Sequence, residues 1–515
     1  MWKERDTPAS PLTTRALWAA VAASALALVV FASFALPEVK NPLATFDWNV
    51  FPVAGAKDVR EAPDILFQSS SSSAPSACGI SPTLLSEFGG KHNFRLSQVH
   101  LGSGYRMQRV LAKAARGEKI RVAVLGGSVS LGHGTDPKTG QRNKYGAVPV
   151  EEQWHQYVRR YFEEIAGVAP EFVLGAKAAT DSSFFEWCWA TLIGTEVDLV
   201  LVEMAVNDEF SSGMDSSENL LRSLLQLDTK PAVIYADTFA LRSGAAQATL
   251  LNGQDLQNSL ASYYDVPQIS ARPALLPAMI RHPELKKPLF LGDVRHGSAK
   301  LHRFLGSMIV GYLQEERCRG EEAAWWADEG KKERRVRQEK RQDGEGEGEV
   351  EAFEWPGTEG LGEVPRVKMN EGWDANVSHA TEPPTCSLAG VDLKPVNESK
   401  DWVLFNWKYS KYYYETTIAN SEEVVFEGEV REGAQGRLAV SFLRSRQYNL
   451  GKARCTVGTQ NAVLDGYWGS STSVAQTTVV AKGLPPGRHR VSCRTLPVQK
   501  GDTGTAFRIM GVMTI

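Results

Sequence analysis

The middle of the chain alternates between short apolar runs and longer stretches with helical periodicity. Four runs are apolar almost throughout, which is typical of parallel strands covered on both faces: Ile120–Leu125, Glu171–Leu174, Val197–Glu203 and Ala232–Ala236. Helical stretches lie between and after these runs, near 151–165, 183–193, 216–227 and 299–316. This rhythm predicts an open α/β sandwich, with helices on both faces of a parallel sheet, over residues 85–318.

The C-terminal part has a different pattern. From residue 385 to 515, short strand-like runs are separated by turn signals such as Gly-Leu-Pro-Pro-Gly at 483–487. The runs are Trp402–Trp407, Ser421–Val430, Gly436–Leu443, Val474–Ala481 and His489–Leu496. Their spacing predicts an all-β sandwich that follows the α/β domain as an accessory domain.

Two segments are predicted to be linkers. Residues 37–84 are rich in Pro and small residues, which favours a stalk with too little apolar surface to form a core. Residues 319–384 begin with dense mixed charge, including Glu-Gly-Lys-Lys-Glu-Arg-Arg and Gly-Glu-Gly-Glu-Gly-Glu. This composition predicts a solvated, disordered linker between the two domains.

The N-terminal region contains a candidate membrane anchor. Residues 16–36 carry no charge, are mostly apolar and are long enough to cross a bilayer as one helix. Lys3, Arg5 and Arg15 precede the run. They predict a type II signal anchor with residues 1–15 in the cytoplasm. The domains would then be lumenal or extracellular, in the Golgi or at the cell surface. The alternative is a cleaved signal peptide, whose apolar core is usually shorter.

Composition narrows the choice of partners and compartment. The 515-residue chain has a formal net charge of −3 and no basic domain surface, which argues against nucleic acid as a partner. Two glycosylation sequons, Asn376-Val-Ser and Asn397-Glu-Ser, agree with a secretory route. Six cysteines permit disulfides there. Cys455 and Cys493 lie in strand-like segments and are the expected pair, whereas Cys188 is interpreted as a buried thiol.

Candidate chemistry begins directly after the first apolar run. Gly126, Gly127 and Gly132 surround Ser128, and glycines allow the sharp turn that would expose its hydroxyl. Asp293 and His296 lie three residues apart, which on a helical turn places a carboxylate beside an imidazole. Such a pair can take a proton from a serine.

Asn207 follows the third apolar run, where its amide can donate to a developing oxyanion. Asp208 is expected to stabilise its loop or cap the next helix. Taken singly, each of these motifs is also compatible with an ordinary turn, helix cap or surface residue.

The ordered set resembles the SGNH, or GDSL-like, hydrolase superfamily over residues 85–318. That superfamily has a nucleophile in a first block ending Gly-Asp-Ser or Gly-Gly-Ser, a third block Gly-x-Asn-Asp and a final Asp-x-x-His. The matching segments here are Gly126-Gly-Ser128, Ala205-Val-Asn-Asp208 and Asp293-Val-Arg-His296. The resemblance implies a three-layer α/β/α fold with Ser128 as nucleophile, His296 as general base and Asp293 as its partner. The N–H of Ser128 and the amide of Asn207 would serve the oxyanion hole.

The second block departs from the superfamily pattern. An ungapped alignment places Ala179 where the oxyanion glycine is expected, although Gly175 is nearby, and Leu174 stands at the usual asparagine position. The third block has Ala205 in place of glycine. Only a backbone N–H is required at the oxyanion position, so alanine can serve there if its dihedral angles permit.

These residues predict a serine esterase that hydrolyses an ester, with O-acetyl or other O-acyl groups on a glycan as the expected substrate. No cofactor is needed, and no tight cluster of His and acidic residues indicates a metal. One alternative is a polysaccharide O-acetyltransferase that uses the same residues. The other is a catalytically weak protein that binds glycans through aromatics of the β domain. Its candidates are Trp402, Trp407, Tyr409, Tyr412, Tyr413, Tyr414, Tyr467 and Trp468.

Overall fold

The computed structural model describes residues 80–134, 148–208, 214–241, 250–342, 361–377, 379, 382–408, 411–469, 473–499, 501 and 504–515. The predicted tail, anchor and most of the stalk therefore lie outside the described residues, as do Tyr409 and Cys78. Among the described helices, none combines the length and apolar character needed to span a membrane.

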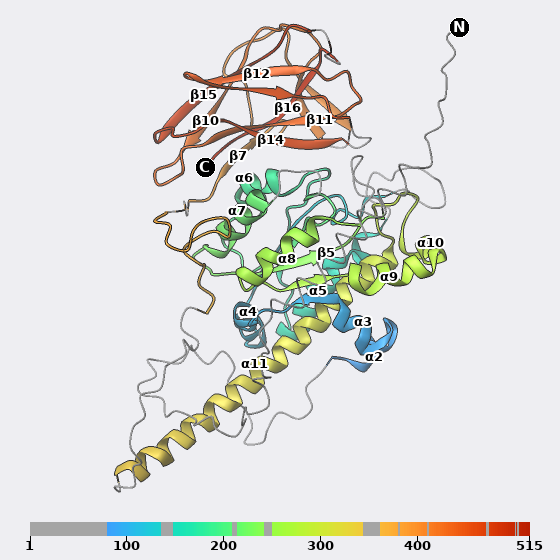
Figure 1. Ribbon diagram of the computed structural model, residues 1–515, viewed down its shortest axis with the longest axis vertical. Coiled ribbons are helices and arrows are strands. Elements are labelled where there is room, and N and C mark those ends of the chain that lie inside the picture. Colours follow the sequence, from blue (N-terminus) through green and yellow to red (C-terminus); the bar gives the residue numbers. More distant parts are fainter. Residues whose placement is uncertain are drawn as a thin grey trace, which may run out of the picture. The chain divides into compact units, whose positions relative to one another are not determined.

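The α/β domain is built on one six-stranded sheet in the order β1-β6-β5-β4-β2-β3 (Figure 1). Neighbouring strands are parallel except at the β1 edge, where β1 runs antiparallel to β6. The strands are β1 (Gln98–His100), β2 (Arg121–Gly126), β3 (Glu171–Leu174), β4 (Leu199–Glu203), β5 (Ala232–Asp237) and β6 (Gln268–Ser270). The four strands expected from the sequence are thus β2 to β5.

Helices cover both faces of this sheet. They are α2 (Pro82–Glu87), α3 (Gly90–Ser97), α4 (Tyr105–Ala115), α5 (Trp154–Ala166), α6 (Ser182–Ile193), α7 (Met214–Leu225), α8 (Gly253–Tyr263), α9 (Arg272–Arg281), α10 (Lys286–Leu289) and α11 (Ala299–Gln342). Short 3-10 turns occur at Val150–Glu152 and Pro283–Leu285.

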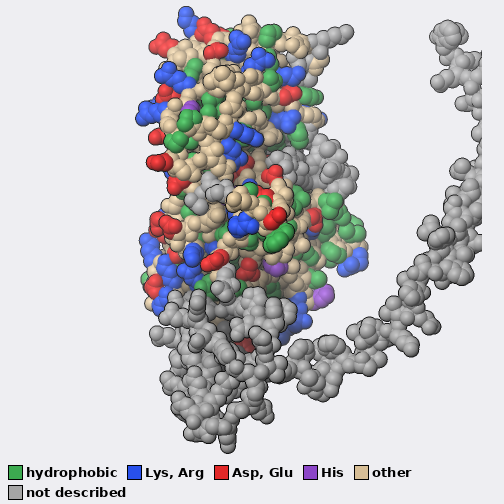
Figure 2. All heavy atoms as spheres, turned by 60° about the vertical axis from the view of Figure 1, so that its left-hand side comes forward, with side chains coloured by type: hydrophobic (Ala, Val, Ile, Leu, Met, Phe, Trp, Pro, Cys, Tyr) green, Lys and Arg blue, Asp and Glu red, His purple; other side chains and the backbone are tan. Residues whose placement is uncertain are grey.

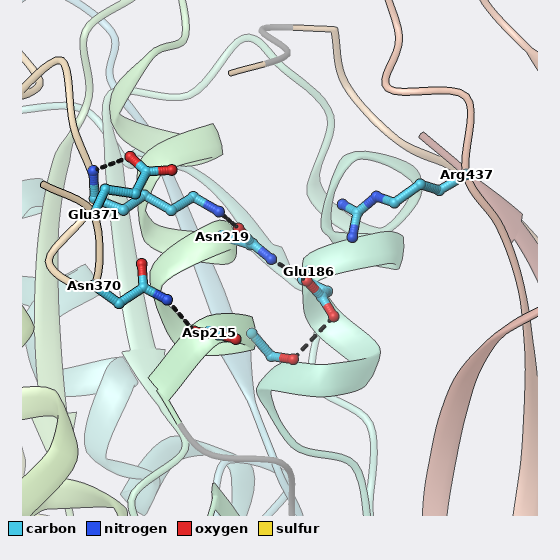
Figure 3. A pocket seen from close by; sticks show the side chains of 8 residues that line it. Glu186, Asp215, Asn219, Asn370, Glu371 and Arg437 are labelled. Atoms are coloured by element: carbon cyan, nitrogen blue, oxygen red, sulfur yellow. Dashed lines mark hydrogen bonds between the residues drawn. The ribbon is translucent and has the colours of Figure 1, made fainter. Parts of the chain in front are cut away.

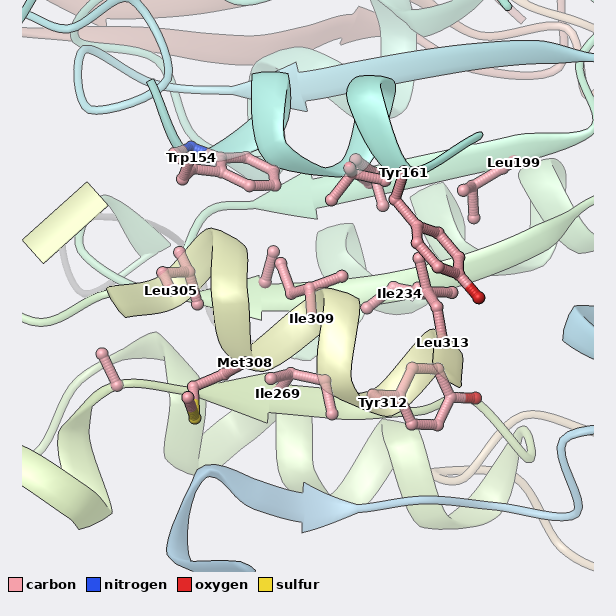
Figure 4. Close-up of a cluster of buried hydrophobic side chains, with 14 of the residues drawn as sticks. Trp154, Tyr161, Leu199, Ile234, Ile269, Leu305, Met308, Ile309, Tyr312 and Leu313 are labelled. Atoms are coloured by element: carbon pink, nitrogen blue, oxygen red, sulfur yellow. The ribbon is translucent and has the colours of Figure 1, made fainter. Parts of the chain in front are cut away.

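Successive strand residues point to opposite faces and so feed two separate cores. Val122 and Val124 of β2 pack with α3, α4, α5 and α11, in the cluster drawn in Figure 4. Ala123 and Leu125 pack on the other face, with α6, α7 and α8. The predicted three-layer arrangement follows from this alternation, because each apolar strand residue needs a helix on its own side.

The prediction of a disordered linker from residue 319 is partly wrong. α11 continues as one helix to Gln342, well past the expected end near 316. Glu, Lys, Arg and Gln are good helix formers, and an ion pair such as Arg317–Glu321 supports successive turns. A charge-dense composition therefore predicted solvent exposure but did not exclude helix.

Residues 361–377 correct the same prediction in a second way. The backbone carbonyls of Pro365 and Val367 accept hydrogen bonds from the buried guanidinium of Arg222 on α7. The Val367 carbonyl also accepts from the hydroxyl of Tyr263 on α8. This part of the connection is fixed to the α/β domain because its backbone acceptors satisfy buried donors there.

The C-terminal domain is the predicted β-sandwich. Its two sheets have the orders β10-β15-β12-β13 and β14-β11-β16-β9-β8, with β7 paired to β16. The strands are β7 (Thr385–Leu388), β8 (Val403–Lys408), β9 (Lys411–Thr416), β10 (Val424–Val430), β11 (Leu438–Arg444), β12 (Lys452–Val457), β13 (Gln460–Asp465), β14 (Val474–Ala481), β15 (Gly487–Thr495) and β16 (Phe507–Thr514). Apolar residues of both sheets, including Phe426, Phe442 and Phe507, form the core between them.

The disulfides confirm one expectation and overturn another. Cys455 and Cys493 face each other directly on β12 and β15 and are bonded, as predicted. Cys188 is not a free buried thiol, because it is bonded to Cys386 on β7. The 198-residue separation of this pair explains the error. It links α6 to the β-sandwich, and no local pattern in the sequence indicates that contact.

The face shown in Figure 2 has no large patch of one charge among the described residues. Lys and Arg side chains of the described residues are interspersed there with Asp and Glu. This distribution is consistent with the near-neutral net charge and does not resemble a nucleic-acid interface.

Candidate active site

The candidate residues lie where three parallel strands end. β2 lies between β3 and β4 in the sheet. The chain passes from β2 to β3 on one side of β2, and then to β4 on the other side of β2. Such a reversal opens a crevice at the carboxyl ends of the strands. Ser128 follows β2, Ala179 follows β3 and Asn207 follows β4, so the sheet topology brings the three predicted loops to one edge.

Ser128, His296 and Asp293 form a hydrogen-bonded chain. Ser128 Oγ lies 2.8 Å from His296 Nε2, and His296 Nδ1 lies 2.8 Å from Asp293 Oδ2. Asp293 Oδ1 also accepts the backbone N–H groups of Arg295 and His296, each at 2.8 Å. The tight turn from 293 to 296 therefore orients both ends of the Asp–His pair.

Asp293 is held in its charged form. Its burial would by itself raise the pKa, but the hydrogen bond and electrostatic attraction of the His296 ring and the two backbone N–H groups outweigh burial, and the pKa of Asp293 lies well below its usual range. An ionised Asp293 accepts the Nδ1 proton of His296, which leaves Nε2 free to accept the proton of Ser128.

Asn207 contacts both of the other loops. Its Nδ2 donates to the carbonyl of Thr180 at 2.6 Å. The same amide lies against Gly127, where an added Cβ would come within 2.3 Å of Nδ2. One N–H of the amide is used by Thr180, so the second is the one available to an oxyanion beside Ser128.

Ala179 has the backbone conformation expected of a glycine. Its φ of 63° lies in the left-handed region, which alanine rarely adopts. Gly175 does not have a positive φ, and an added Cβ there would lie 2.6 Å from a methyl group of Ile193. Gly175 thus allows close packing, whereas Ala179 occupies the turn position predicted for the second oxyanion block.

A buried acid supports the serine loop from behind. Glu203, at the end of β4, accepts from Ser130 Oγ at 3.0 Å, from Thr238 Oγ1 at 3.3 Å and from the backbone N–H of Gly127. Burial raises the pKa of Glu203 to about 8 against these hydrogen bonds. Neither Glu203 nor Ser130 is among the site residues predicted from the sequence. Their signal was the second serine in Gly-Gly-Ser-Val-Ser.

Asp208 ties the second and third loops together, as its predicted loop-stabilising role requires. Its carboxylate accepts the N–H and Oγ of Ser182, the Oγ of Ser217 and the Nε2 of Gln257. Burial raises the pKa of this fully enclosed group. Ser182 is the first residue of α6, so the start of that helix is fixed beside Asn207.

Two buried histidines complete the packing behind Ser130. His155 Nε2 lies 3.0 Å from the Ser130 carbonyl, and His302 Nδ1 accepts the backbone N–H of Trp154. Burial lowers the pKa of His155 to about 4 and that of His302 to about 3. Both are neutral structural groups at pH 7, while His133 donates its backbone N–H to the Ser128 carbonyl.

A separate polar cavity of about 470 Å³ lies at the junction of α6, α7, residues 368–371 and the start of β11 (Figure 3). Its lining includes Glu186, Asp215, Asn219, Asn370, Glu371 and Arg437. None of the predicted catalytic residues lines it. Packing accounts for three of the eight candidate aromatics of the β domain, since Trp402, Tyr413 and Tyr414 are buried, whereas Tyr467 is exposed.

Two solved structures of a two-domain esterase active on acetylated mannans are similar to this chain. One is 15% identical with a TM-score of 0.53, and its match covers 82% of this chain and 98% of that chain. The other was co-crystallised with mannopentaose and is 16% identical with a TM-score of 0.51, covering 82% and 97%. At this level of identity the comparison shows the two-domain fold. No protein-family model and no curated protein matches the sequence.

The left-handed conformation of Ala179 leads to a stability prediction. Replacing Ala179 with Gly should raise the free energy of unfolding by about 0.5–1 kcal/mol, because relief of backbone strain exceeds the entropy that glycine adds to the unfolded chain. Ala178→Gly is the matched control and should lower it, since Ala178 has no positive φ to relieve. Urea denaturation measures both. Equal changes in the two variants would contradict the assigned strain.

Glu203 and Asp237 predict a pH dependence of stability. Burial raises the pKa of each to about 8, above unfolded values of about 4. The stabilisation that these two acids give the folded protein is complete below pH 4 and is lost as pH rises through 8. The free energy of unfolding should therefore fall between pH 7 and pH 9. The buried histidines have lowered pKa values, so they change the free energy of unfolding only below pH 7.

Glu203→Gln mimics the protonated acid and should reduce this fall. Urea denaturation of the wild type and the variant at pH 7 and pH 9 makes the comparison. A fall of the same size in both proteins would show that Glu203 does not titrate in this range.

Proposed function

We propose that this protein is a serine-dependent carboxylic ester hydrolase that removes O-acyl groups, most simply O-acetyl groups, from a glycan. The observation that carries the proposal is the continuous chain from Ser128 Oγ through His296 to Asp293, with both links at 2.8 Å. A hydrolase of this kind needs only a nucleophile, a base with an oriented ring and donors for the oxyanion.

The proposed reaction follows from the directions of these hydrogen bonds. Ser128 Oγ attacks the ester carbonyl carbon while its proton passes to His296 Nε2. The charge on the carbonyl oxygen is stabilised by Asn207 Nδ2 and by backbone N–H groups of Ser128 and Ala179. The carbon–oxygen bond to the sugar then breaks, and His296 returns the proton to the sugar oxygen. Water attacks the acyl-serine by the same route, which releases the acid and restores Ser128.

The choice of a glycan ester is supported by the similar structures rather than by the site itself. The two-domain esterase with the same overall fold is active on acetylated mannans and was crystallised with mannopentaose. This chain shares its combination of an α/β domain and a β-sandwich, and the resemblance to SGNH hydrolases agrees with an acyl substrate.

Ester cleavage should depend on Ser128 and His296. In the full-length protein, Ser128→Ala and His296→Ala should each lower kcat for p-nitrophenyl acetate about 10³-fold or more, because the nucleophile or its base is lost. Ser262→Ala and His282→Ala, at exposed positions, are the matched controls and should keep wild-type rates. Release of acetate from acetylated mannan then tests the glycan substrate.

The outcomes separate the proposal from its alternatives. A folded wild type no faster than Ser128→Ala would contradict ester hydrolysis. Product that forms only when an unacetylated oligosaccharide is added would instead indicate acetyl transfer. Glycan binding that is equal in wild type and Ser128→Ala, without turnover, would indicate a binding protein.

We also propose a secretory location with residues 16–36 as the membrane anchor. The apolar segment and the two disulfides that join described residues, Cys188–Cys386 and Cys455–Cys493, support it, because disulfides persist in oxidising compartments. The full-length protein should remain in the membrane pellet after a carbonate wash, whereas a chain beginning at residue 37 behind a cleaved signal should be released. Release of both forms would exclude an anchor.

A further inference from the structure

The β-sandwich contacts the loop that carries Ala179. We define this oxyanion loop as residues 175–181, between β3 and α6. The backbone N–H of Ala475, on β14, donates to the carbonyl of Ala179 at 3.0 Å. The residue contacted is the one whose φ of 63° gives the loop its turn.

The geometry of β14 makes this donor available. Among the described strands, β14 lies at the edge of its sheet and pairs with β11, where Ala475 lies opposite Leu443. In an antiparallel pair, alternate residues direct their N–H groups away from the partner strand. An edge strand therefore presents unpaired donors. The Ala475 N–H finds an acceptor on the other domain.

Three further contacts hold β14 in place against the α/β domain. The Cys188–Cys386 disulfide joins α6 to β7. Ala439 and Met513 of the β-sandwich are buried in the same apolar cluster as Trp187 and Trp189. The Arg437 guanidinium lies 4.8 Å from the centre of the Trp187 ring, at the cavity edge seen in Figure 3.

We propose that the β-sandwich is a positioning element of the oxyanion hole, acting through the N–H of Ala475. The carbonyl of Ala179 is held by Ala475, and the next carbonyl, of Thr180, is held by Asn207. These two bonds fix the peptide planes that follow Ala179 and so maintain its left-handed turn. The same bond to Thr180 orients the Asn207 amide, so the position of the β-sandwich affects two oxyanion donors at once. This inference rests on the hydrolase function proposed above.

The test removes the donor and leaves the strand intact. Ala475→Pro deletes the N–H without removing a bond of the β11–β14 ladder, and the proline ring takes the place of that hydrogen beside the Ala179 carbonyl. In the full-length protein it should lower kcat for p-nitrophenyl acetate about 10- to 100-fold with KM unchanged, because misplaced oxyanion donors stabilise the transition state less. The affinity for a boronic acid that forms a tetrahedral adduct with Ser128 should weaken in parallel.

Two matched variants separate positioning from general damage. Ala475→Gly keeps the N–H and should retain wild-type kcat. Thr477→Pro makes the same change two residues along the strand, opposite Ser441, and should also retain it. Wild-type kcat in a folded Ala475→Pro protein, or equal losses in Ala475→Pro and Thr477→Pro, would overturn the inference. If the wild type itself shows no Ser128-dependent activity, the proposed function fails instead.

A second variant tests the same inference if Ala475→Pro does not fold. Exchange of both Cys188 and Cys386 for Ser removes the tether between α6 and β7 while leaving β14 unaltered. Measured well below its melting temperature, this variant should again show lower kcat and weaker boronate binding at unchanged KM. Wild-type values for all three would overturn the inference.

Discussion

The carboxamide of Asn207 lies where three loops of the α/β domain meet. It donates to Thr180 in the second loop and rests against Gly127 in the first, at a distance that leaves no room for a side chain at 127. A small shift of any one strand would break this contact or cause a clash. The parallel register of β2, β3 and β4 is therefore also the constraint that sets the geometry of the candidate site.

Buried polar groups keep that register. Glu203 collects donors from the serine loop and from Thr238 after β5, and Asp208 collects them from α6, α7 and α8. Each hydrogen bond replaces a water contact that burial removes, so a partly satisfied carboxyl would be costly. The raised pKa of Glu203 shows that burial destabilises its charged form despite these hydrogen bonds. Buried groups with shifted pKa values are common beside active sites.

The sequence predicted the parts of the site that depend on local pattern and strand order. Apolar runs identified β2 to β5, and parallel strands bring the residues after them to one edge, so Ser128 and Asn207 could be placed together. The Asp293–His296 pair was indicated by its spacing together with the other motifs, because Asp-x-x-His alone is also compatible with a helix cap followed by a surface histidine. The left-handed turn at Ala179 was only suggested by alignment. Glycine in a sequence indicates that a positive φ is possible, whereas alanine does not. The bond between Cys188 and Cys386 was missed, since only tertiary packing brings α6 to β7.

α6 explains why a second domain can matter to a site made by the first. Its N-terminal residue Ser182 is hydrogen-bonded to Asp208 in the site, and about 1.7 turns later Cys188 is bonded to Cys386 of the β-sandwich. A helix transmits displacement along its axis with little loss, so the two attachments are mechanically linked. Residues 361–377 are fixed to the α/β domain, but chain connectivity from there to β7 would not by itself set the orientation of β7 to that domain. The disulfide and the apolar contacts around Trp187 provide that orientation, and with it the register of β14 beside Ala179.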